Sequence, residues 1–506
     1  MPAAELVVDV PKIKKAAHNA IPLTITTYTL PHDIEIYMEE VLDVFLSELG
    51  QKKLKDYLVY CLRELAVNAK KANTKRVYFD AKSLDINDPG EYEEGMKTFK
   101  QDTLENISYY LGKQKEKGYY VKIIFQAKGS NIIIEVRNNV EINKKEYVRI
   151  HDKLARSRQY NSLEEALSNV LDPSEGAGLG LVILVLMLKK IGLDEECFDI
   201  WAENGETVAR ITVPVAATRI ESLSLLTDEV VKSITSLPKF PENVVQIQRL
   251  IADPQSQIVD IARAISTDPA LTADLLKLVN SAAFMLQKKV DNIVDAVKMA
   301  GMRGIRGLLY SYGTFKILGD DSTEDRKKLW DHCYRAAYYS YNIARNFKPQ
   351  NKILLDDAYV GGMLHDMGKI VFSTVHPELL DKIRRFCSEK DIPASTFEDM
   401  AGGMNHAEIG ARIAEKWNFP DPLIAAIRYH HEPSLVGLEN RDVVYTVYLA
   451  NIFCEYENGG IAFDQIETAP LAEIGLVGEK AFKKVVETMS EGFRMETGRR
   501  QPMKKG

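Results

Sequence analysis

Five histidines and one aspartate in the C-terminal half of the chain stand in an order that could hold metal. They are His332, the adjacent pair His365-Asp366, His406 and the adjacent pair His430-His431. Imidazole nitrogens and a carboxylate suit divalent ions of borderline to hard character, and an ion held this way can activate water near neutral pH. Any one of these residues alone is more often an ordinary core or surface residue. As an ordered set they predict a divalent transition-metal site whose ligands come from several helices.

This order resembles that of the HD phosphohydrolase superfamily, an all-helical fold with ligands in the sequence H…HD…H…H…D. The resemblance implies that one set of residues holds a first ion and a second set is available for another. The first set is His332, His365, Asp366 and Asn451, and the second is His406, His430 and His431. Asn451 departs from the family, because it stands in Val447–Ile452 where an aspartate is expected. Its amide oxygen can coordinate a metal ion but supplies no charge to balance one.

Lys369 is a further candidate for the chemistry of this site. It follows His365 by one helical turn and could point at a phosphate oxygen as a catalytic group. A surface lysine is the alternative interpretation.

The segment upstream of these residues resembles one branch of the superfamily, the HDOD family of signalling output modules. Helix starts are indicated at Asp253-Pro254 and Asp268-Pro269, where an N-cap precedes proline at the first helical position. The wording LPKFP at Leu237–Pro241 and NSAAF at Asn280–Phe284 also matches. The resemblance implies an output module that acts through protein partners. The cyclic di-GMP phosphodiesterase branch fits less well, because no Gly-Tyr-Pro element follows the paired histidines.

The N-terminal half contains a second constellation. Glu64 and Asn68 are four residues apart on one face of a predicted helix at about 53–72. Glycines 176, 178 and 180 lead directly into an apolar helix, and glycines at a helix N-terminus allow close approach of phosphate to backbone N–H groups. A predicted hairpin (119–126 and 132–137) and a closing strand at 207–214 accompany these motifs.

Together these features resemble the histidine-kinase-like ATPase domain, the GHKL or Bergerat fold, over about residues 54–215. The resemblance implies ATP or ADP with Mg²⁺ as cofactor: Asn68 holds the magnesium, Glu64 acts as base or polar organiser, and Gly176, Gly178 and Gly180 hinge a lid at about 144–175. Asn138 replaces the aspartate that accepts a hydrogen bond from the adenine amino group, and Val140 and Ile142 stand where glycines are usual. Too little chain precedes Glu64 for a dimerisation domain, so a self-sufficient histidine kinase is not expected.

The expected protein is therefore multidomain, with an N-terminal α/β sandwich of Bergerat type and a C-terminal all-α HD/HDOD fold. We expect an ATPase-like domain at 1–215, a connector helix at 216–232, an HDOD domain at 233–436, and C-terminal helices with a basic tail at 437–506. Residues 80–117 form an apparent insertion.

Composition describes an ordinary globular protein. The chain has 506 residues with 45% hydrophobic and 27% charged residues, and its net charge of −7 disfavours a general nucleic-acid binder. Its five cysteines are scattered and no signal peptide or membrane-length apolar run is present, so a cytoplasmic protein without membrane contact is expected.

Three functions remain open from the sequence. The first is a bacterial signal-transduction regulator that couples a nucleotide-binding module to an HDOD output acting on protein partners, as a monomer or homo-oligomer. The second is a metal-dependent phosphohydrolase acting on a nucleotide or cyclic dinucleotide. The third is a kinase acting on a partner protein.

Overall fold

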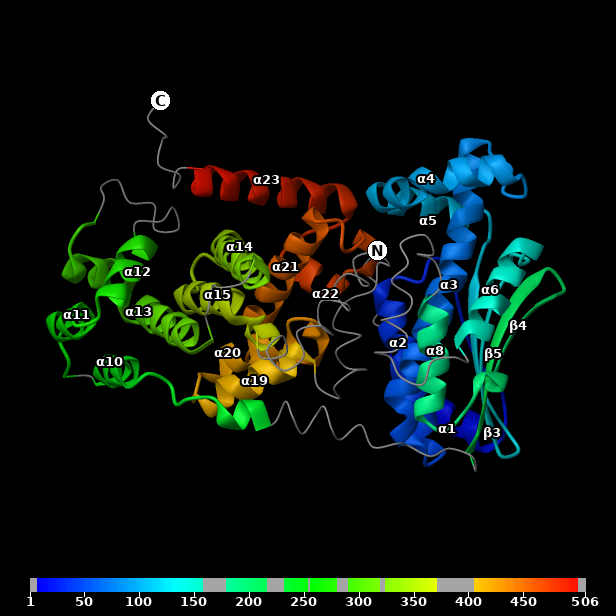
Figure 1. The fold of residues 1–506 in the computed structure, drawn as a ribbon, viewed down its shortest axis with the longest axis horizontal. Helices are drawn as coiled ribbons and strands as arrows, with labels where there is room; N and C mark the ends of the chain where they lie inside the picture. Colours follow the sequence, from blue (N-terminus) through cyan, green and yellow to red (C-terminus); the bar gives the residue numbers. More distant parts are fainter. Residues whose placement is uncertain are drawn as a thin grey trace. The chain divides into compact units, whose positions relative to one another are not determined.

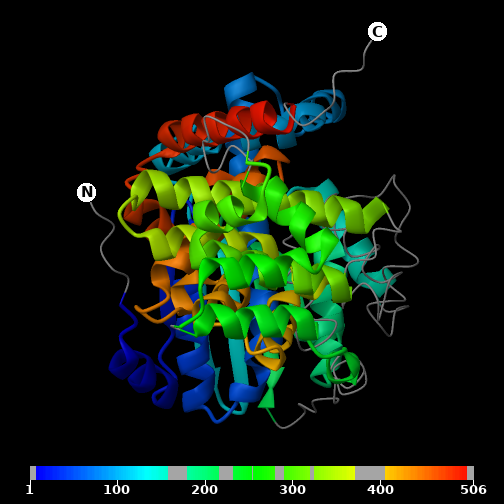
Figure 2. The same ribbon diagram turned by 90° about the vertical axis from the view of Figure 1, so that its left-hand side faces the viewer.

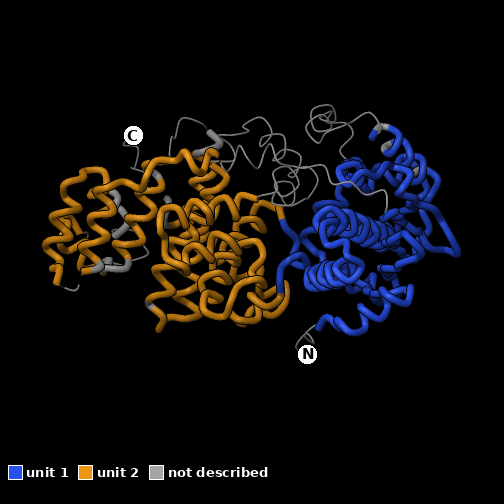
Figure 3. Tube along the Cα trace, turned by 90° about the horizontal axis from the view of Figure 1, so that it is seen from below, with its two compact units in different colours: residues 1–223, 381–396, 461–467 blue, residues 224–380, 397–460, 468–506 orange. Residues whose placement is uncertain are grey.

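The computed structural model describes residues 7–157, 179–215, 232–253, 255–279, 290–318, 324–370 and 405–498. These residues form two compact units, coloured separately in Figure 3. Unit 1 contains the described residues up to 215 together with 461–467, and unit 2 contains the remainder. The predicted connector (except residue 232), Gly176 and Gly178 lie outside the described residues.

Unit 1 consists of helices and five strands in an α/β arrangement (Figure 1). In chain order they are α1 (Val10–His18), β1 (Leu23–Thr27), α2 (His32–Glu48), η1 (Lys52–Leu54), α3 (Lys55–Lys82), α4 (Pro89–Glu105), α5 (Ile107–Glu116), β2 (Val121–Lys128), β3 (Asn131–Asn138), α6 (Lys144–Ser157), α8 (Leu179–Lys190), η3 (Glu195–Cys197), β4 (Phe198–Glu203), β5 (Glu206–Pro214) and η7 (Phe463–Gln465).

The sheet is antiparallel throughout, with strand order β1-β2-β3-β5-β4. The expected hairpin is β2 and β3, and the expected closing strand is β5. Alternate residues of each strand face the helices. One row of paired apolar residues crosses the sheet through Phe125, Ile134, Ile211 and Phe198, each at most 3% exposed. The edge strands β1 and β4 were not expected from the sequence.

Helices α2, α3 and α8 lie on one side of this sheet (Figure 1). Helix α8 is buried around most of its circumference, which explains why the run from Leu181 to Leu188 has no polar face. The same run is too short to span a bilayer, and in the described part of the chain no helix combines the length and apolarity that a membrane crossing requires.

The apparent insertion forms α4 and α5, which pack on the last turns of α3. Tyr78 and Phe79 make aromatic contacts there with Tyr92, Phe99 and Tyr110. Helix α3 therefore continues to Lys82 instead of ending near residue 72, because its extra turns contribute to this aromatic cluster.

Residues 461–467 pack on unit 1 although the flanking helices belong to unit 2. Asp464 forms an ion pair with Lys70 of α3, and both side chains are about nine-tenths buried. Ala462 and Phe463 contact Ile107 and Leu111 of α5. This short segment is therefore fastened by both a buried charge pair and an apolar cluster, and the sequence had placed it with the C-terminal helices.

Unit 2 is all-helical. Its elements are α10 (Glu242–Ala252), α11 (Ile258–Ser266), α12 (Pro269–Val279), α13 (Ile293–Leu318), α14 (Glu324–Phe347), α15 (Lys352–Leu364), α19 (His406–Lys416), α20 (Asp421–Tyr429), η6 (Pro433–Leu435), α21 (Arg441–Glu457), α22 (Thr468–Glu473) and α23 (Glu479–Gly498). Figure 2 shows several of the green to yellow-green helices running side by side. The expected N-cap at Asp268 is confirmed, since its carboxylate accepts hydrogen bonds from the backbone N–H groups of Ala270 and Leu271. The expected N-cap at Asp253 is wrong: Asp253 caps the C-terminus of α10, and α11 begins after Gln257.

Helices α14, α15 and α21 pack together in the centre of unit 2. A close approach of α15 to α14 depends on Gly362, since a Cβ there would lie 2.8 Å from Ala337 Cα and 2.9 Å from the Ala336 carbonyl oxygen. Gly361 faces α21 and α20 in the same way. A Cβ there would lie 3.0 Å from Val447 Cγ2 and 3.1 Å from Ala426 Cβ. Two adjacent glycines thus let α15 lie against three neighbours.

Candidate metal centre and ligand pocket

The ordered histidines and Asp366 come together in unit 2; His332 lies within α14, and the others lie at the ends of helices. His365 and Asp366 directly follow α15, and His430 and His431 directly follow α20. His406 is the first residue of α19, whose N-cap is the side chain of Asn405. Adjacent residues on a helix diverge by about 100°, whereas residues at a helix end are free to turn into one pocket. This placement explains how two adjacent pairs can serve a single site.

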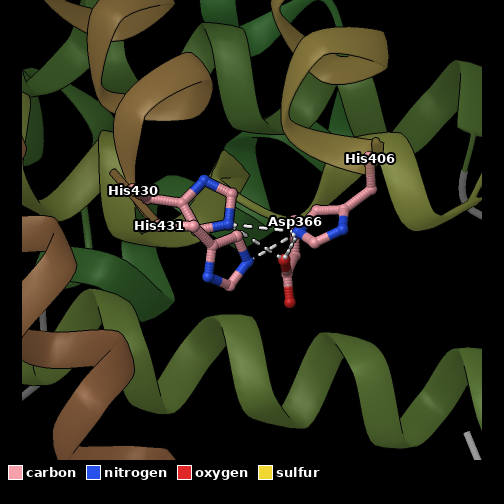
Figure 4. A group of neighbouring side chains, drawn as sticks. All are labelled: Asp366, His406, His430 and His431. Atoms are coloured by element: carbon pink, nitrogen blue, oxygen red, sulfur yellow. Dashed lines mark hydrogen bonds and ion pairs between the residues drawn. The ribbon is translucent and has the colours of Figure 1, made fainter. Parts of the chain in front are cut away.

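Asp366 lies between two groups of imidazoles, one on each carboxylate oxygen. Figure 4 shows the group that contains His406, His430 and His431. Its Oδ1 is 3.1 Å from His406 Nε2 and 3.5 Å from His430 Nε2. Its Oδ2 is 3.4 Å from His332 Nε2 and 3.5 Å from His365 Nε2. His431 Nε2 completes the first group at 3.0 Å from His406 Nε2. The six expected His and Asp residues therefore share one cluster.

The tautomers of two histidines follow from their backbone contacts. His365 Nδ1 lies 2.8 Å from the Gly362 carbonyl oxygen and His430 Nδ1 lies 2.7 Å from that of Ile427. A carbonyl oxygen only accepts, so each Nδ1 carries the proton and donates it. Burial lowers the pKa of both imidazoles, which are therefore neutral near pH 7. Each Nε2 consequently presents a lone pair to the cluster.

These lone pairs fit a bound cation. His365 Nε2 is 3.3 Å from His332 Nε2, and His430 Nε2 is 3.2 Å from His406 Nε2. Two nitrogen ligands about 2.1 Å from a tetrahedral ion lie roughly 3.4 Å from each other. The buried Oδ1 of Asp366 also receives no hydrogen bond of good geometry from the described residues. Two Nε2 lone pairs directed into one cluster of imidazoles, beside an unsatisfied carboxylate oxygen, are the arrangement expected of metal ligands.

Charge around the cluster also favours a cation at Asp366. Burial on its own would favour the neutral carboxyl, but the neighbouring imidazoles, that of His365 foremost, and the ammonium group of Lys369 hold the pKa of Asp366 well below its usual range. Lys369 Nζ donates to Asp366 Oδ2 over 2.7 Å. Lys369 and His332 are 22% and 24% exposed, whereas the other side chains on Asp366 are buried, so solvent reaches the cluster at this edge.

Asn451 lies on α21 and is 2% exposed. Its Nδ2 donates to Glu455 Oε1 over 3.2 Å. Its part in a metal shell remains a prediction.

In unit 1, four expected residues line one cavity of about 560 Å³: Glu64, Asn68, Asn138 and Gly180. Glu64 Oε1 accepts from Asn68 Nδ2 over 2.7 Å. A Cβ on Gly180 would lie 1.9 Å from the same oxygen, so the start of α8 and the middle of α3 meet at this side chain. The cavity is also lined by Met96 and Phe99 of α4, which the sequence had not assigned to a site.

The orientation of the Asn138 amide follows from a chain of contacts. Asn73 Nδ2 donates to the Tyr120 carbonyl oxygen, and Asn138 Nδ2 donates to Asn73 Oδ1, both over 3.0 Å. Because the carbonyl oxygen only accepts, it determines the direction of both amides. Asn138 therefore presents its own carbonyl oxygen to the cavity that it lines. Asn73 had not been identified from the sequence, since nothing in its spacing distinguishes it from other helix residues.

Gly368 controls how closely α19 approaches the cluster. A Cβ at this position would lie 1.9 Å from the His406 carbonyl oxygen and 2.7 Å from Gly410 N. We expect Gly368→Ala to push His406 away from Asp366, to lower the free energy of unfolding by about 1–3 kcal/mol, and to reduce metal uptake. Thermal unfolding and elemental analysis measure the two effects. Gly437→Ala is the matched control, since its nearest atom is 3.9 Å away; equal behaviour of the two variants would contradict the close-contact argument.

Comparisons with known proteins match a domain within the C-terminal half and, in one relative, nearly the whole chain. The family model described as the HDOD domain matches residues 237–433. An uncharacterized protein of Treponema pallidum (strain Nichols) is 42% identical over 493 residues, which cover 97% of this chain and 95% of that protein. An HDOD domain protein of unknown function from Geobacter sulfurreducens has 20% identity and a TM-score of 0.42, covering 54% of this chain and 96% of that one. The chain therefore belongs to one family with the T. pallidum protein and contains an HDOD domain at residues 237–433.

Proposed function

We propose that the protein is a signal-transduction regulator. In this proposal unit 1 binds a nucleotide, and the HDOD domain carries a divalent metal centre and acts on protein partners. The observation that carries the proposal is the position of Asp366, whose two oxygens each face a separate group of histidine nitrogens. A carboxylate shared in this way suits two ions held side by side.

The residues proposed to hold metal divide between the two oxygens of Asp366. His332 and His365 lie on the Oδ2 side, and His406, His430 and His431 on the Oδ1 side. The Gly362 and Ile427 carbonyl oxygens hold the His365 and His430 rings in place by accepting from Nδ1. Such outer contacts fix the orientation and raise the basicity of ligating imidazoles.

The first prediction on function concerns metal content. Wild-type protein incubated with Mn²⁺ and desalted should retain up to two ions per chain by elemental analysis. Asp366→Asn should lose both, because the carboxylate is common to the two groups, whereas His332→Ala should lose only the ion on the Oδ2 side. His18→Ala, at an exposed histidine paired with Glu48, should behave as wild type. Wild-type protein that takes up no metal would show that the histidines are structural and would remove the proposal.

A second candidate function, a metal-dependent phosphohydrolase, is favoured by Lys369. Its ammonium group lies on Asp366 at the solvent-accessible edge of the cluster, where it could bind a phosphate oxygen. When bound, a divalent ion supplies Lewis-acid chemistry toward such an oxygen. The chain's own contribution is to hold the phosphate with Lys369 and to keep His365 and His430 neutral through burial.

Turnover of a simple phosphodiester separates this candidate from the first. If the site is hydrolytic, Mn²⁺-loaded protein should cleave bis(p-nitrophenyl) phosphate, and Lys369→Met should lower kcat/KM by about tenfold or more while metal content is retained. Lys327→Met serves as the control, since Lys327 is an exposed lysine of the same unit, on α14. If metal-loaded wild-type protein shows no turnover, this hydrolase activity is excluded and the regulator remains as the proposed function.

Nucleotide binding in unit 1 is supported by the convergence of Glu64, Asn68, Asn138 and Gly180 on one cavity. Asn68 offers an amide that can coordinate Mg²⁺, and Asn138 offers an acceptor for an amino group on a base. Lys71 and Arg149 also line the cavity and could balance phosphate charge. These features favour ATP or ADP bound with Mg²⁺ in a domain of the histidine-kinase-like type.

Calorimetric titration of the full chain tests this part of the proposal. ATP or ADP should bind only with Mg²⁺, and Asn68→Ala should abolish binding. Gly180→Ala should weaken it, because the added Cβ displaces Glu64 from Asn68. Asn87→Ala, in an exposed loop before α4, should leave the affinity unchanged. Absence of binding to wild-type protein at millimolar nucleotide would refute the nucleotide assignment.

A further inference from the structure

A charge deficit in the metal cluster is the starting point. The cluster contains five histidines and a single carboxylate, that of Asp366. A histidine that ligates a metal does so as a neutral imidazole and brings no negative charge, and the ammonium group of Lys369, 2.7 Å from Asp366 Oδ2, adds a positive one. One or two divalent ions would therefore leave several uncompensated positive charges in a buried site, which is strongly unfavourable. A further carboxylate is needed close by.

Glu455 is placed to provide it. It lies one helical turn after Asn451 on α21, so the two side chains share a face of the helix. Glu455 is half-buried, and burial raises the pKa of its carboxyl, whereas the neighbouring Lys369 and His332 act in the opposite direction and favour the carboxylate. It lies outside both groups of closely spaced ligand atoms, which argues for an indirect role.

The hydrogen bond between Glu455 and Asn451 indicates what that role is. Asn451 Nδ2 donates to Glu455 Oε1 over 3.2 Å. A carboxylate only accepts, so Glu455 determines which end of the amide faces it. The Asn451 carbonyl oxygen is then the end that remains for a metal ion. A carboxylate behind an amide also increases the negative charge on the carbonyl oxygen, as a carboxylate behind a ligating imidazole does.

We propose that Glu455 is the positioning residue of the metal centre: it orients Asn451 as an oxygen ligand and supplies the negative charge that Asn451 lacks. The inference rests on the proposed metal centre. The negative charge then lies on Glu455, one helical turn from Asn451, and it acts on the metal through the hydrogen-bonded Asn451 amide.

The test compares the affinity of full-length variants for Co²⁺, measured by calorimetry and by the visible absorption of the bound ion. Glu455→Gln should weaken the affinity about tenfold or more, the effect usual for removal of an outer-shell partner. The double variant Asn451→Asp/Glu455→Gln exchanges the amide and the carboxylate, so it retains both the hydrogen bond and the charge. It should recover most of the lost affinity and the wild-type absorption spectrum.

Glu457→Gln is the control on the same helix, because Glu457 pairs with Arg335 and Tyr339. It should change thermal stability without changing Co²⁺ affinity. Unchanged affinity in Glu455→Gln, or a double variant no better than Glu455→Gln, would overturn the role of Glu455 while leaving the metal centre intact. Failure of wild-type protein to bind Co²⁺ would instead remove the metal centre, and the role of Glu455 with it.

Discussion

The C-terminal unit is organised around one buried carboxylate. Asp366 is fully buried, and imidazole nitrogens lie within 3.5 Å of each of its oxygens. A buried charge is unfavourable unless it is paired, so the fold has to bring cations or cation ligands to both oxygens. Except for His332 within α14, the ligand candidates lie at helix ends, where adjacent side chains can converge, and glycines allow the backbones to approach closely. Gly362 brings α14 to α15, and Gly368 brings α19 to the residues after Asp366. Residues 362–368 therefore supply candidate metal ligands as well as the glycines that allow the helices to pack closely.

Much of this site could be predicted from the sequence, because ligand identity is local information. His and Asp are recognisable as ligands wherever they stand, and their order along the chain matched a known superfamily. The arrangement of these side chains in space could not be predicted from the sequence. Adjacent ligands on a continuous helix would diverge, and only the structure places His365-Asp366 and His430-His431 beyond the ends of α15 and α20. Glu455 carried a usable signal, since it follows Asn451 by four residues, but its significance depends on knowing which face of α21 meets the cluster.

In unit 1 the strongly patterned elements were predictable and the weakly patterned ones were not. Strands β2, β3 and β5 are eight or nine residues long and rich in β-branched apolar residues, whereas β1 and β4 are short edge strands that gain their regular structure by pairing. The contact of residues 461–467 with α3 and α5 depends on the Lys70–Asp464 pair, whose partners are almost four hundred residues apart. No local pattern can indicate such a pair. For the same reason α4 and α5 were recognised as an insertion, but their place on the wall of the cavity was not.

In each unit an asparagine stands where the resemblance seen in the sequence would have an aspartate, and in both the structure specifies how its amide is turned. In unit 1 the Tyr120 carbonyl oxygen orients Asn73, which orients Asn138, so an acceptor still faces the cavity. In unit 2 Glu455 accepts from Asn451. The two replacements preserve a hydrogen-bond acceptor and differ in what happens to the charge. If unit 1 binds a nucleotide as proposed, an amino group on the base would need only an acceptor at Asn138, without its charge. If unit 2 binds a metal ion as proposed, the ion would need charge as well as an oxygen near Asn451, so a carboxylate would have to remain within reach of the site. Replacement of a carboxylate by an amide is therefore compatible with either site, provided that a neighbour fixes the amide and, where a cation is bound, keeps the charge.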